Sequence, residues 1–597
     1  MNLRTLVLAA AAFAACAKFC IAAPAADWTT PAEKAKFQTT PSYAETRAYL
    51  QRLAQAAPGT IHLSRFGVSP EGRDLMLVVA ASGGEFTPQA ARASGKTILL
   101  VQSGIHAGEI EGKDAALMLL RDLAFEPKRA KLLDYTILVW LPIFNVDGHE
   151  HSTPFNRINQ NGPARMGYRA TAQNLNLNRD YMKVDAPEMR DWIALFDAWQ
   201  PDLFFDIHTT DGADFQYDFT WYMEQWGPLP APVQAWQTKA VEQDILPAFE
   251  KMGHLAAPYL SGVDHNDITK GIANFGSGPR FSTGYVALRN RAAVLVETHM
   301  LKPYAVRVKA AHDFVLATLE RLARDDGALR KAVTQADTEV AARGAGTSLA
   351  VAFETSKESV PFTFKGYEFK TEPSAISGDV WVHYDPRKPR TWVIPNFRDL
   401  VPTRSVTLPS AWLVPSGWPQ IIDKLRQHGV RMERIDHAIE LGVERHQLDQ
   451  PKWQQASFEG HHMLRDFKQA SVSARVAFAP GTMLIPTDQP LANLAANLLE
   501  PAAADSLLRW GLFDAIFEQK EYADARVAEQ VARDMLAKDP SLRAQFEERL
   551  KSDPEFAKSP WARLGFFYER SPWYASQRIG AYPVVRLDAA ALREARR

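Results

Sequence analysis

Cysteine is almost absent from this chain, because only Cys16 and Cys20 occur among its 597 residues. Both lie in an N-terminal stretch where Arg4 precedes an apolar run, followed by small residues and an Ala-x-Ala-like cleavage site at residues 23–25. This pattern is typical of a secretory signal peptide, so we expect residues 1–25 to be removed on export. Cleavage there leaves a chain without a thiol, which excludes disulfides and a cysteine nucleophile.

The same segment allows a second processing route. Residues 13–16 (FAAC) are close to a lipoprotein processing site, which would leave a lipid on Cys16. The sequence therefore predicts an exported protein that is periplasmic or secreted, with a lipid anchor on Cys16 as the alternative.

An excess of charge and long apolar runs are also missing. The 68 Lys and Arg residues nearly balance the 69 Asp and Glu residues, and no basic stripe is present, which argues against nucleic-acid binding. Beyond the N-terminal segment no apolar run has membrane-spanning length, and no repeat of solenoid period occurs. The chain is long enough to build two or three cores.

Short apolar runs alternate with helix-like stretches in the first half of the chain. The runs of strand length are residues 96–102, 135–141, 202–207 and 292–296. The stretches with helical spacing are residues 113–123, 186–199 and 233–252. This alternation predicts an α/β fold with a mixed, mainly parallel sheet covered by helices.

The pattern changes after residues 343–348 (RGAGTS), where we expect a domain boundary. Residues 360–369 and 380–384 alternate with period two, as half-buried antiparallel strands do, and residues 491–517 have helical spacing. We predict a C-terminal accessory α+β region over residues 348–597, made of one or two units.

His106 and Glu109 stand three residues apart, just after an apolar run. Imidazole and carboxylate are zinc ligands, but the spacing alone is weak evidence. With 15 His residues in the chain, about one His-x-x-Glu is expected by chance. A second occurs at His437 and Glu440 without a histidine at a neighbouring strand end, and we expect it to be a surface pair.

Three side chains share one kind of position: His106, His208 and Glu297 each follow an apolar run. Sheets of this type bind ligands at the carboxyl ends of their strands, so we expect these residues to converge. His106, Glu109 and His208 would hold one zinc ion with an open fourth position, and Glu297 is the candidate general base. Taken singly, each is more often structural or solvated; their shared position favours the functional interpretation.

Residues 167–181 contain Arg169, Asn178 and Arg179. A guanidinium can hold a carboxylate through two hydrogen bonds, so Arg179 with Asn178 suits a substrate carboxylate. Arg169 suits a developing oxyanion. Each is at least equally expected as an ordinary surface residue.

These segments together resemble the zinc metallocarboxypeptidases, and the resemblance covers residues 39–307. Four motifs match in order: residues 66–75 (FGVSPEGRDL), 106–109 (HAGE), 144–152 (FNVDGHEHS) and 177–181 (LNRDY). The strand at residues 205–208 (FDIH) and Glu297 then follow in the expected order.

The resemblance implies a catalytic domain over residues 27–342 that hydrolyses the C-terminal peptide bond of peptides with a free C-terminal carboxylate. It also implies a role for each matching residue: zinc ligation by His106, Glu109 and His208, the base Glu297, carboxylate binding by Asn178 and Arg179, polarisation of the scissile carbonyl by Arg169, and substrate capping by Tyr285.

Some positions depart from the family pattern. Gly108 stands where the digestive members carry an arginine. Asn176 replaces the aspartate that often orients the first histidine, although its amide oxygen can still accept a hydrogen bond. Because the match around residues 161–168 is poor, Arg157 or Arg165 is an alternative candidate for the role given to Arg169, polarisation of the scissile carbonyl.

Two other functions remain open at this point. A zinc amidase of the same fold, acting on cell-wall peptides or N-acyl amino acids, would use the same metal and base. A non-catalytic peptide-binding protein is disfavoured because all three ligands and Glu297 are present together.

Overall fold

The computed structural model describes residues 27–210, 212–225, 227, 229–274, 276, 278–574 and 578–597. The signal peptide predicted for residues 1–25, including Cys16, lies outside the described residues. No helix within these ranges is long and apolar enough to cross a membrane.

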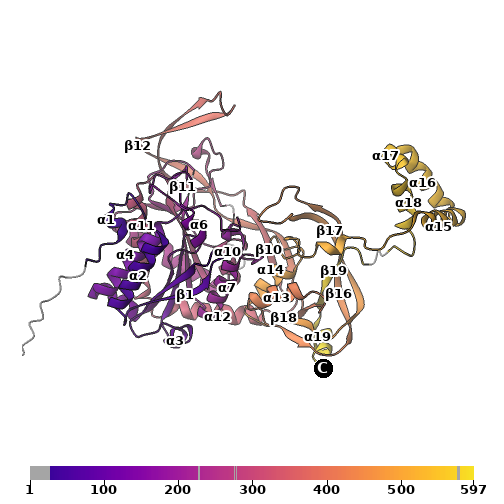
Figure 1. Cartoon of the computed structure of the whole chain (residues 1–597), viewed down its shortest axis with the longest axis horizontal. Helices are drawn as coiled ribbons and strands as arrows, with labels where there is room; N and C mark the ends of the chain where they lie inside the picture. Colours follow the sequence, from indigo (N-terminus) through magenta and orange to yellow (C-terminus); the bar gives the residue numbers. More distant parts are fainter. Residues whose placement is uncertain are drawn as a thin grey trace, which may run out of the picture.

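The N-terminal part of the chain, coloured indigo to magenta in Figure 1, is built on an eight-stranded sheet with the order β1-β2-β4-β3-β5-β9-β6-β7. Its strands are β1 (Ile61–Val68), β2 (Asp74–Ala80), β3 (Thr97–Ser103), β4 (Thr136–Leu141), β5 (Leu203–Thr210), β6 (Phe219–Tyr222), β7 (Ala256–Pro258) and β9 (Ala292–His299). β3 is parallel to β4 and β5, and β5 is parallel to β9. The pairs β1–β2, β2–β4 and β6–β9 are antiparallel. The predicted mixed α/β sheet is confirmed.

The central strands are apolar on both faces because helices cover both faces. On β3, Leu99 and Val101 enter one core, while Ile98 and Leu100 enter the other. The first core is covered by α2 (Tyr43–Ala56), α4 (Glu111–Phe125), α8 (Ala231–Thr238), α9 (Leu246–Lys251), α11 (Tyr304–Leu322) and α12 (Ala328–Ala342). The second is covered by α7 (Pro187–Trp199) and α10 (Ser282–Leu288).

The C-terminal part begins with two strand pairs. β10 (Ser348–Thr355) pairs with β13 (Leu400–Thr407), and between them β11 (Val360–Pro373) and β12 (Val380–Phe397) form a long hairpin that extends beyond the body (Figure 1). The end of β12 pairs with β8 (Ile272–Ala273), so this hairpin is joined to the N-terminal part.

A six-stranded sheet follows, with the order β15-β18-β14-β19-β16-β17. Its strands are β14 (Ala411–Val414), β15 (Glu433–Ile435), β16 (Ile439–Trp453), β17 (Leu464–Phe478), β18 (Thr482–Pro486) and β19 (Ala581–Leu587). Trp412 of this sheet and Trp192 of α7 belong to the same buried cluster. The two parts of the chain therefore share an apolar core, to which α13 (Pro419–Gln427) and α14 (Ala492–Leu499) also contribute.

The helical stretch predicted for residues 491–517 is only partly helical. α14 ends at Leu499, and Glu500 is extended, with φ −80° and ψ 125°. Glu500 precedes Pro501, and a residue before proline is pushed out of the helical region. The later residues form turns and a short 3₁₀ helix at Asp514–Phe517.

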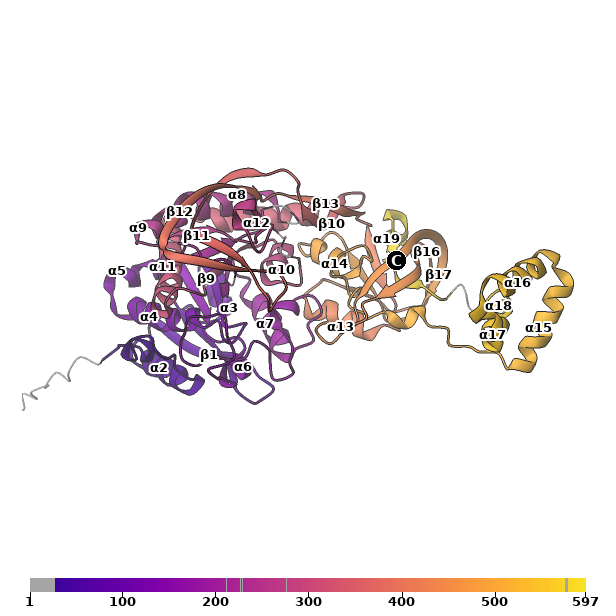
Figure 2. The same ribbon diagram turned by 90° about the horizontal axis from the view of Figure 1, so that it is seen from above.

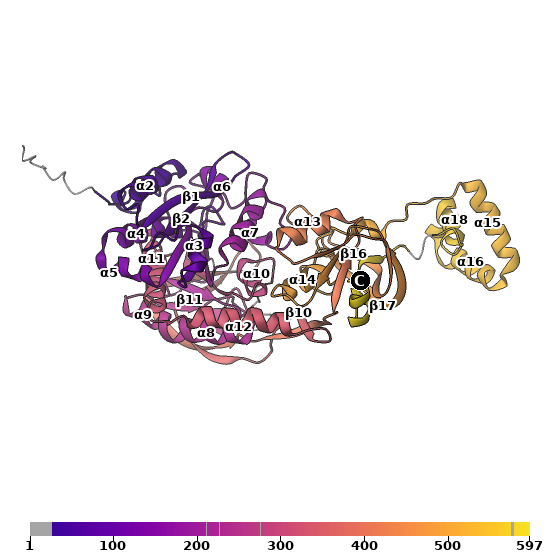
Figure 3. The same ribbon diagram turned by 90° about the horizontal axis from the view of Figure 1, so that it is seen from below.

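Four helices stand apart from the six-stranded sheet, as Figures 2 and 3 show: α15 (Ala525–Lys538), α16 (Pro540–Ser552), α17 (Pro554–Lys558) and α18 (Pro560–Tyr568). They bury a small core of their own, which includes Leu542, Phe556, Phe566 and Phe567. The last helix, α19 (Ala589–Ala595), returns to the sheet and packs on β16 and β19.

Candidate metal centre and active site

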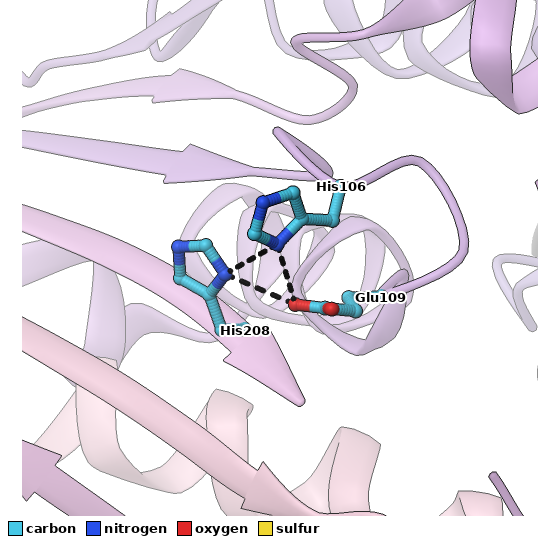
Figure 4. Close-up of side chains that lie close together, drawn as sticks. All are labelled: His106, Glu109 and His208. Atoms are coloured by element: carbon cyan, nitrogen blue, oxygen red, sulfur yellow. Dashed lines mark hydrogen bonds and ion pairs between the residues drawn. The ribbon is translucent and has the colours of Figure 1, made fainter. Parts of the chain in front are cut away.

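Three potential metal ligands meet at the carboxyl end of the central strands (Figure 4). His106 and Glu109 lie in the turn between β3 and α4, and His208 lies near the end of β5. The Nδ1 atoms of His106 and His208 are 3.1 Å apart, and Glu109 Oε2 lies 3.2 and 3.0 Å from them. The structure thus brings together His106, Glu109 and His208, the three side chains that the sequence predicted would hold one zinc ion.

The chemistry of this donor set fits one zinc ion. Two imidazoles and a carboxylate are typical ligands of catalytic zinc, and all three side chains here are buried. Burial lowers the pKa of His106 to about 4, so its imidazole is neutral near pH 7, as a metal ligand must be. At 3.1 Å the two Nδ1 atoms can share one proton between them, and a metal ion would take the place of that proton.

Glu109 is held as a carboxylate by arginines on its far side. Its Oε1 accepts hydrogen bonds from Arg157 Nη2 at 2.6 Å and Arg169 Nη1 at 3.2 Å. Burial acts to raise the pKa of Glu109, but His106 and Arg157 outweigh it and hold that pKa well below its usual range. Arg165, the other rival of Arg169, instead bonds the backbone of Ser152 at the surface.

Each histidine also has a partner for its second nitrogen. His106 Nε2 lies 3.1 Å from Asn176 Oδ1, the contact expected from the sequence, and His208 Nε2 lies 2.8 Å from Asp206 Oδ2. Such partners fix the tautomer with a proton on Nε2, so that Nδ1 faces the metal. Burial acts to lower the pKa of His208, but Asp206 raises it well above its usual range, so a metal must displace a proton there.

Asp206 was missed by the sequence reasoning, although a signal for it exists. It precedes His208 by two residues on β5, and alternate residues of a strand share a face. Its Oδ1 accepts a hydrogen bond of 2.8 Å from Gln102 Nε2 on the neighbouring strand β3. The buried carboxylate is thus fixed by the sheet itself.

Glu297 lies beside this centre because β9 is the parallel neighbour of β5. In the register of that pair, Glu297 is opposite His208. Burial, helped by the charges of Glu109 and Asp206, raises the pKa of Glu297 to about 8. A carboxyl group with a pKa near neutrality can both accept and return a proton.

Asn178 and Arg179 lie in a short 3₁₀ helix, Leu177–Arg179. Arg179 stacks on Phe281 at 4.4 Å and donates to Asn178 O at 2.7 Å. Burial and then Arg169 lower its pKa to about 10, and no described carboxylate forms an ion pair with it. A part-buried cation of this kind is suited to an anionic group of a ligand.

Tyr285 is not brought to this site. Its ring is fully buried, and its hydroxyl lies 2.9 Å from His428 Nδ1 and accepts a 3.2 Å hydrogen bond from Arg289. These contacts link α10 to the C-terminal part instead of exposing the phenol to a ligand. The geometry therefore gives no support to the substrate-capping role expected for Tyr285.

Comparison with known proteins finds a matching family for part of this sequence. The sequence model described as zinc carboxypeptidase matches residues 46–223, which include all three candidate ligands. Residues 46–223 are a zinc carboxypeptidase domain by this match. The resemblance inferred from the sequence motifs is confirmed, and family membership supports a hydrolase of the metallocarboxypeptidase class.

Relatives of this zinc carboxypeptidase domain extend over much of the chain. Carboxypeptidase 2 of Trichophyton rubrum is 24% identical over 482 residues, which cover 78% of this chain and 82% of the relative. Zinc carboxypeptidase A 1 of Drosophila melanogaster is 33% identical over 117 residues, or 19% of this chain and 26% of the relative.

Solved structures of the same class are more distant. The metallo-carboxypeptidase from Burkholderia cenocepacia has 17% identity and a TM-score of 0.37, covering 48% of this chain and 70% of its own. The carboxypeptidase A from Helicoverpa armigera has 19% identity and a TM-score of 0.37, covering 49% of this chain and 75% of its own.

Proposed function

We propose that this protein is a zinc-dependent metallocarboxypeptidase that hydrolyses the C-terminal peptide bond of peptides. The observation that carries the proposal is a cation without an ion-pair partner among the described residues, Arg179, in the loop that also holds Asn176 against the ligand His106. A metal centre can serve many hydrolases, but a nearby carboxylate-binding arginine selects substrates that end in a free carboxylate.

His106, Glu109 and His208 would hold one zinc ion, which would lower the pKa of a water molecule and polarise a carbonyl. Glu297 accepts the proton of the attacking water and later returns it to the leaving amine. The half-buried position of Glu297 and its raised pKa suit this exchange of a proton.

The arginines divide the remaining work. Arg179 and Asn178 bind the terminal carboxylate of the substrate. Arg157, whose side chain is 14% exposed, stays on Glu109 and orients it, whereas Arg169 is 42% exposed and its bond to Glu109 is longer. Arg169 is thus free to turn toward the oxygen of the scissile carbonyl, where charge develops in the transition state.

The wider assignment follows from this role. Residues 27–342 form the catalytic domain and residues 348–597 the accessory region. The protein acts after export, in the periplasm or medium, with lipid anchoring at Cys16 as the alternative form.

A peptide library with free or amidated C-termini, analysed by mass spectrometry with and without a chelator, tests the proposal. We expect the loss of single C-terminal residues from free peptides only, abolished by the chelator. Replacing Arg179 by Met removes a charge-assisted bond to the substrate and should lower kcat/KM about 10- to 100-fold. The matched control Arg190→Met changes an exposed arginine of α7 and should have no effect.

Each alternative predicts a different product. Release of acyl groups or cleavage within cell-wall peptides, without loss of terminal residues, would indicate the amidase. A protein that binds one zinc ion and peptides but leaves every peptide intact would be the binding protein.

A further inference from the structure

A tight turn of the accessory region is built onto the catalytic domain. It joins β16 to β17, and Phe458 and His461 exchange backbone hydrogen bonds of 2.8 and 3.1 Å across it. Phe458 stacks on Trp510, and Arg280 of the catalytic domain lies over both rings. His461 Nε2 lies 2.7 Å from Asp185 Oδ2. The position of this turn is therefore fixed against the catalytic domain on both sides.

The side chain of Glu459 reaches from this turn to the metal centre through one intermediary. Glu459 Oε2 accepts a 2.8 Å hydrogen bond from the backbone N–H of Asn176. The side-chain oxygen of Asn176 accepts from the N–H of Asn178 at 3.0 Å and lies 3.1 Å from His106 Nε2. Asn176 is thus fixed at both its backbone and its amide, and its remaining acceptor position is directed at the metal ligand.

The backbone of the turn suggests that this residue is present for its side chain. Glu459 has φ +51° and Gly460 has φ +81°, the conformation of a two-residue hairpin turn with positive φ at both positions. Asn and Gly are favoured in such turns, whereas a longer side chain such as Glu is disfavoured in the left-handed region. The strained backbone of Glu459 is therefore consistent with a role for its side chain, which the hydrogen bond to Asn176 supplies.

We propose that Glu459 is a positioning residue of the zinc centre. By holding Asn176, it keeps the proton of His106 on Nε2 and the metal-binding Nδ1 directed at the ion. This inference rests on the proposed function, in which His106 is a zinc ligand. It assigns the accessory region a direct part in the site, because the metal centre is complete only when this turn is docked.

Glu459 has a second, electrostatic effect on the carboxylate clamp, the pair Asn178 and Arg179 proposed to bind the substrate carboxylate. Glu459 is bound to the backbone of Asn176, three residues before Arg179, and among acidic side chains it most strongly opposes the lowering of the pKa of Arg179 by burial and Arg169. Its negative charge therefore weakens the attraction of the clamp for a substrate carboxylate. The hydrogen bond and the charge can be separated by substitution, because glutamine keeps the acceptor oxygen and removes the charge.

The experiment compares Glu459→Gln, Glu459→Ala and Glu459→Asn in the full chain. The control is Glu440→Ala, which removes an exposed ion pair with Arg475 on the same two strands. The affinity of the metal-free proteins for zinc is measured by competition with a chromophoric chelator. Thermal unfolding, kcat and KM on one C-terminal peptide are measured on the same samples.

We expect Glu459→Ala to weaken zinc binding about tenfold, the lower end of the effect of removing a partner behind a metal ligand. Glu459→Gln should restore affinity to within about threefold of wild type and lower KM, because the acceptor remains and the opposing charge is gone. Asparagine is favoured in this turn, but its side chain is one methylene too short to reach the N–H of Asn176. The Glu459→Asn variant should therefore bind zinc as weakly as Glu459→Ala and have an unfolding temperature no lower than that of wild type.

Wild-type zinc affinity in the Ala and Asn variants would overturn the positioning role. So would a Gln variant as weak as the Ala variant, because the acceptor oxygen would then not matter. If zinc affinity responds as expected but wild type shortens no peptide, the proposed function fails and the positioning role stands. If wild type removes C-terminal residues but the Glu459 variants bind zinc as tightly as wild type, the proposed function stands and the positioning role fails.

Discussion

Replacing Asp206 by Asn should weaken the metal site without disturbing the sheet. The substitution keeps the size of the side chain and an oxygen for Gln102, but it removes the charge 2.8 Å from His208 Nε2. Both groups are buried, so solvent screens their interaction little. Loss of such a partner typically costs 10- to 100-fold in metal affinity, which corresponds to about 1.4–2.8 kcal/mol.

The pH dependence of zinc binding gives this prediction a second signature. In wild type, Asp206 raises the pKa of His208, so zinc displaces a proton near pH 7 and its affinity increases with pH. In the Asn variant that pKa falls, and the increase with pH should flatten. Calorimetric zinc titrations of metal-free protein at several pH values measure both effects.

Asp202→Asn is the matched control. Asp202 is also buried, but it accepts the N–H of Ile98 at the opposite end of β5, about 20 Å from His208 at 3.3 Å per residue. The control should bind zinc as wild type does. Equal affinities for wild type and Asp206→Asn, with equal pH slopes, would refute the role assigned to Asp206.

Three further predictions follow from the site. In metal-free protein the pKa of Glu297 is raised to about 8, so the protein loses stability as the pH rises from about 4.5 toward 8. The Glu297→Gln variant should therefore unfold a few degrees above wild type at pH 8 and at nearly the same temperature at pH 4.5, as measured by circular dichroism. Tyr285→Phe should leave kcat/KM unchanged but reduce the free energy of unfolding by about 1–3 kcal/mol, because His428 Nδ1 loses a buried partner; a large loss of activity in stable protein would restore Tyr285 as a substrate contact. Gly108→Ala places a Cβ 2.6 Å from Arg157 Cγ and 2.7 Å from a backbone oxygen, so it should displace Arg157 and lower the affinity for zinc in the same titration. Unchanged zinc affinity would show that the loop moves to accept the methyl group without disturbing the site.

The convergence of His106, His208 and Glu297 could be predicted from the sequence because their positions depend on local pattern. Apolar runs identify β3, β5 and β9, and parallel neighbours end at the same edge of a sheet, which places His106, His208 and Glu297 together. The pair His437 and Glu440 lacks this context, and the structure leaves both exposed. Spacing indicated a site only where a strand end supported it.

Other parts of the site depend on information that local pattern does not carry. Tyr285 lies on a short helix, and the sequence does not show which face of α10 meets the cleft and which packs on His428. Glu459 lies 283 residues from Asn176, in a turn whose docking depends on a core shared by both parts of the chain. Such long-range contacts follow from tertiary packing and leave no periodic trace in the sequence.

The central claim is that Glu297 is the base of a zinc-dependent carboxypeptidase. It is tested most directly by kcat/KM of zinc-loaded wild type and Glu297→Gln on one peptide that loses a single C-terminal residue. Loss of the base should lower kcat/KM by about 10²- to 10⁴-fold, with one zinc ion still bound to each protein. A variant that binds zinc equally and works within about threefold of wild type would contradict the claim.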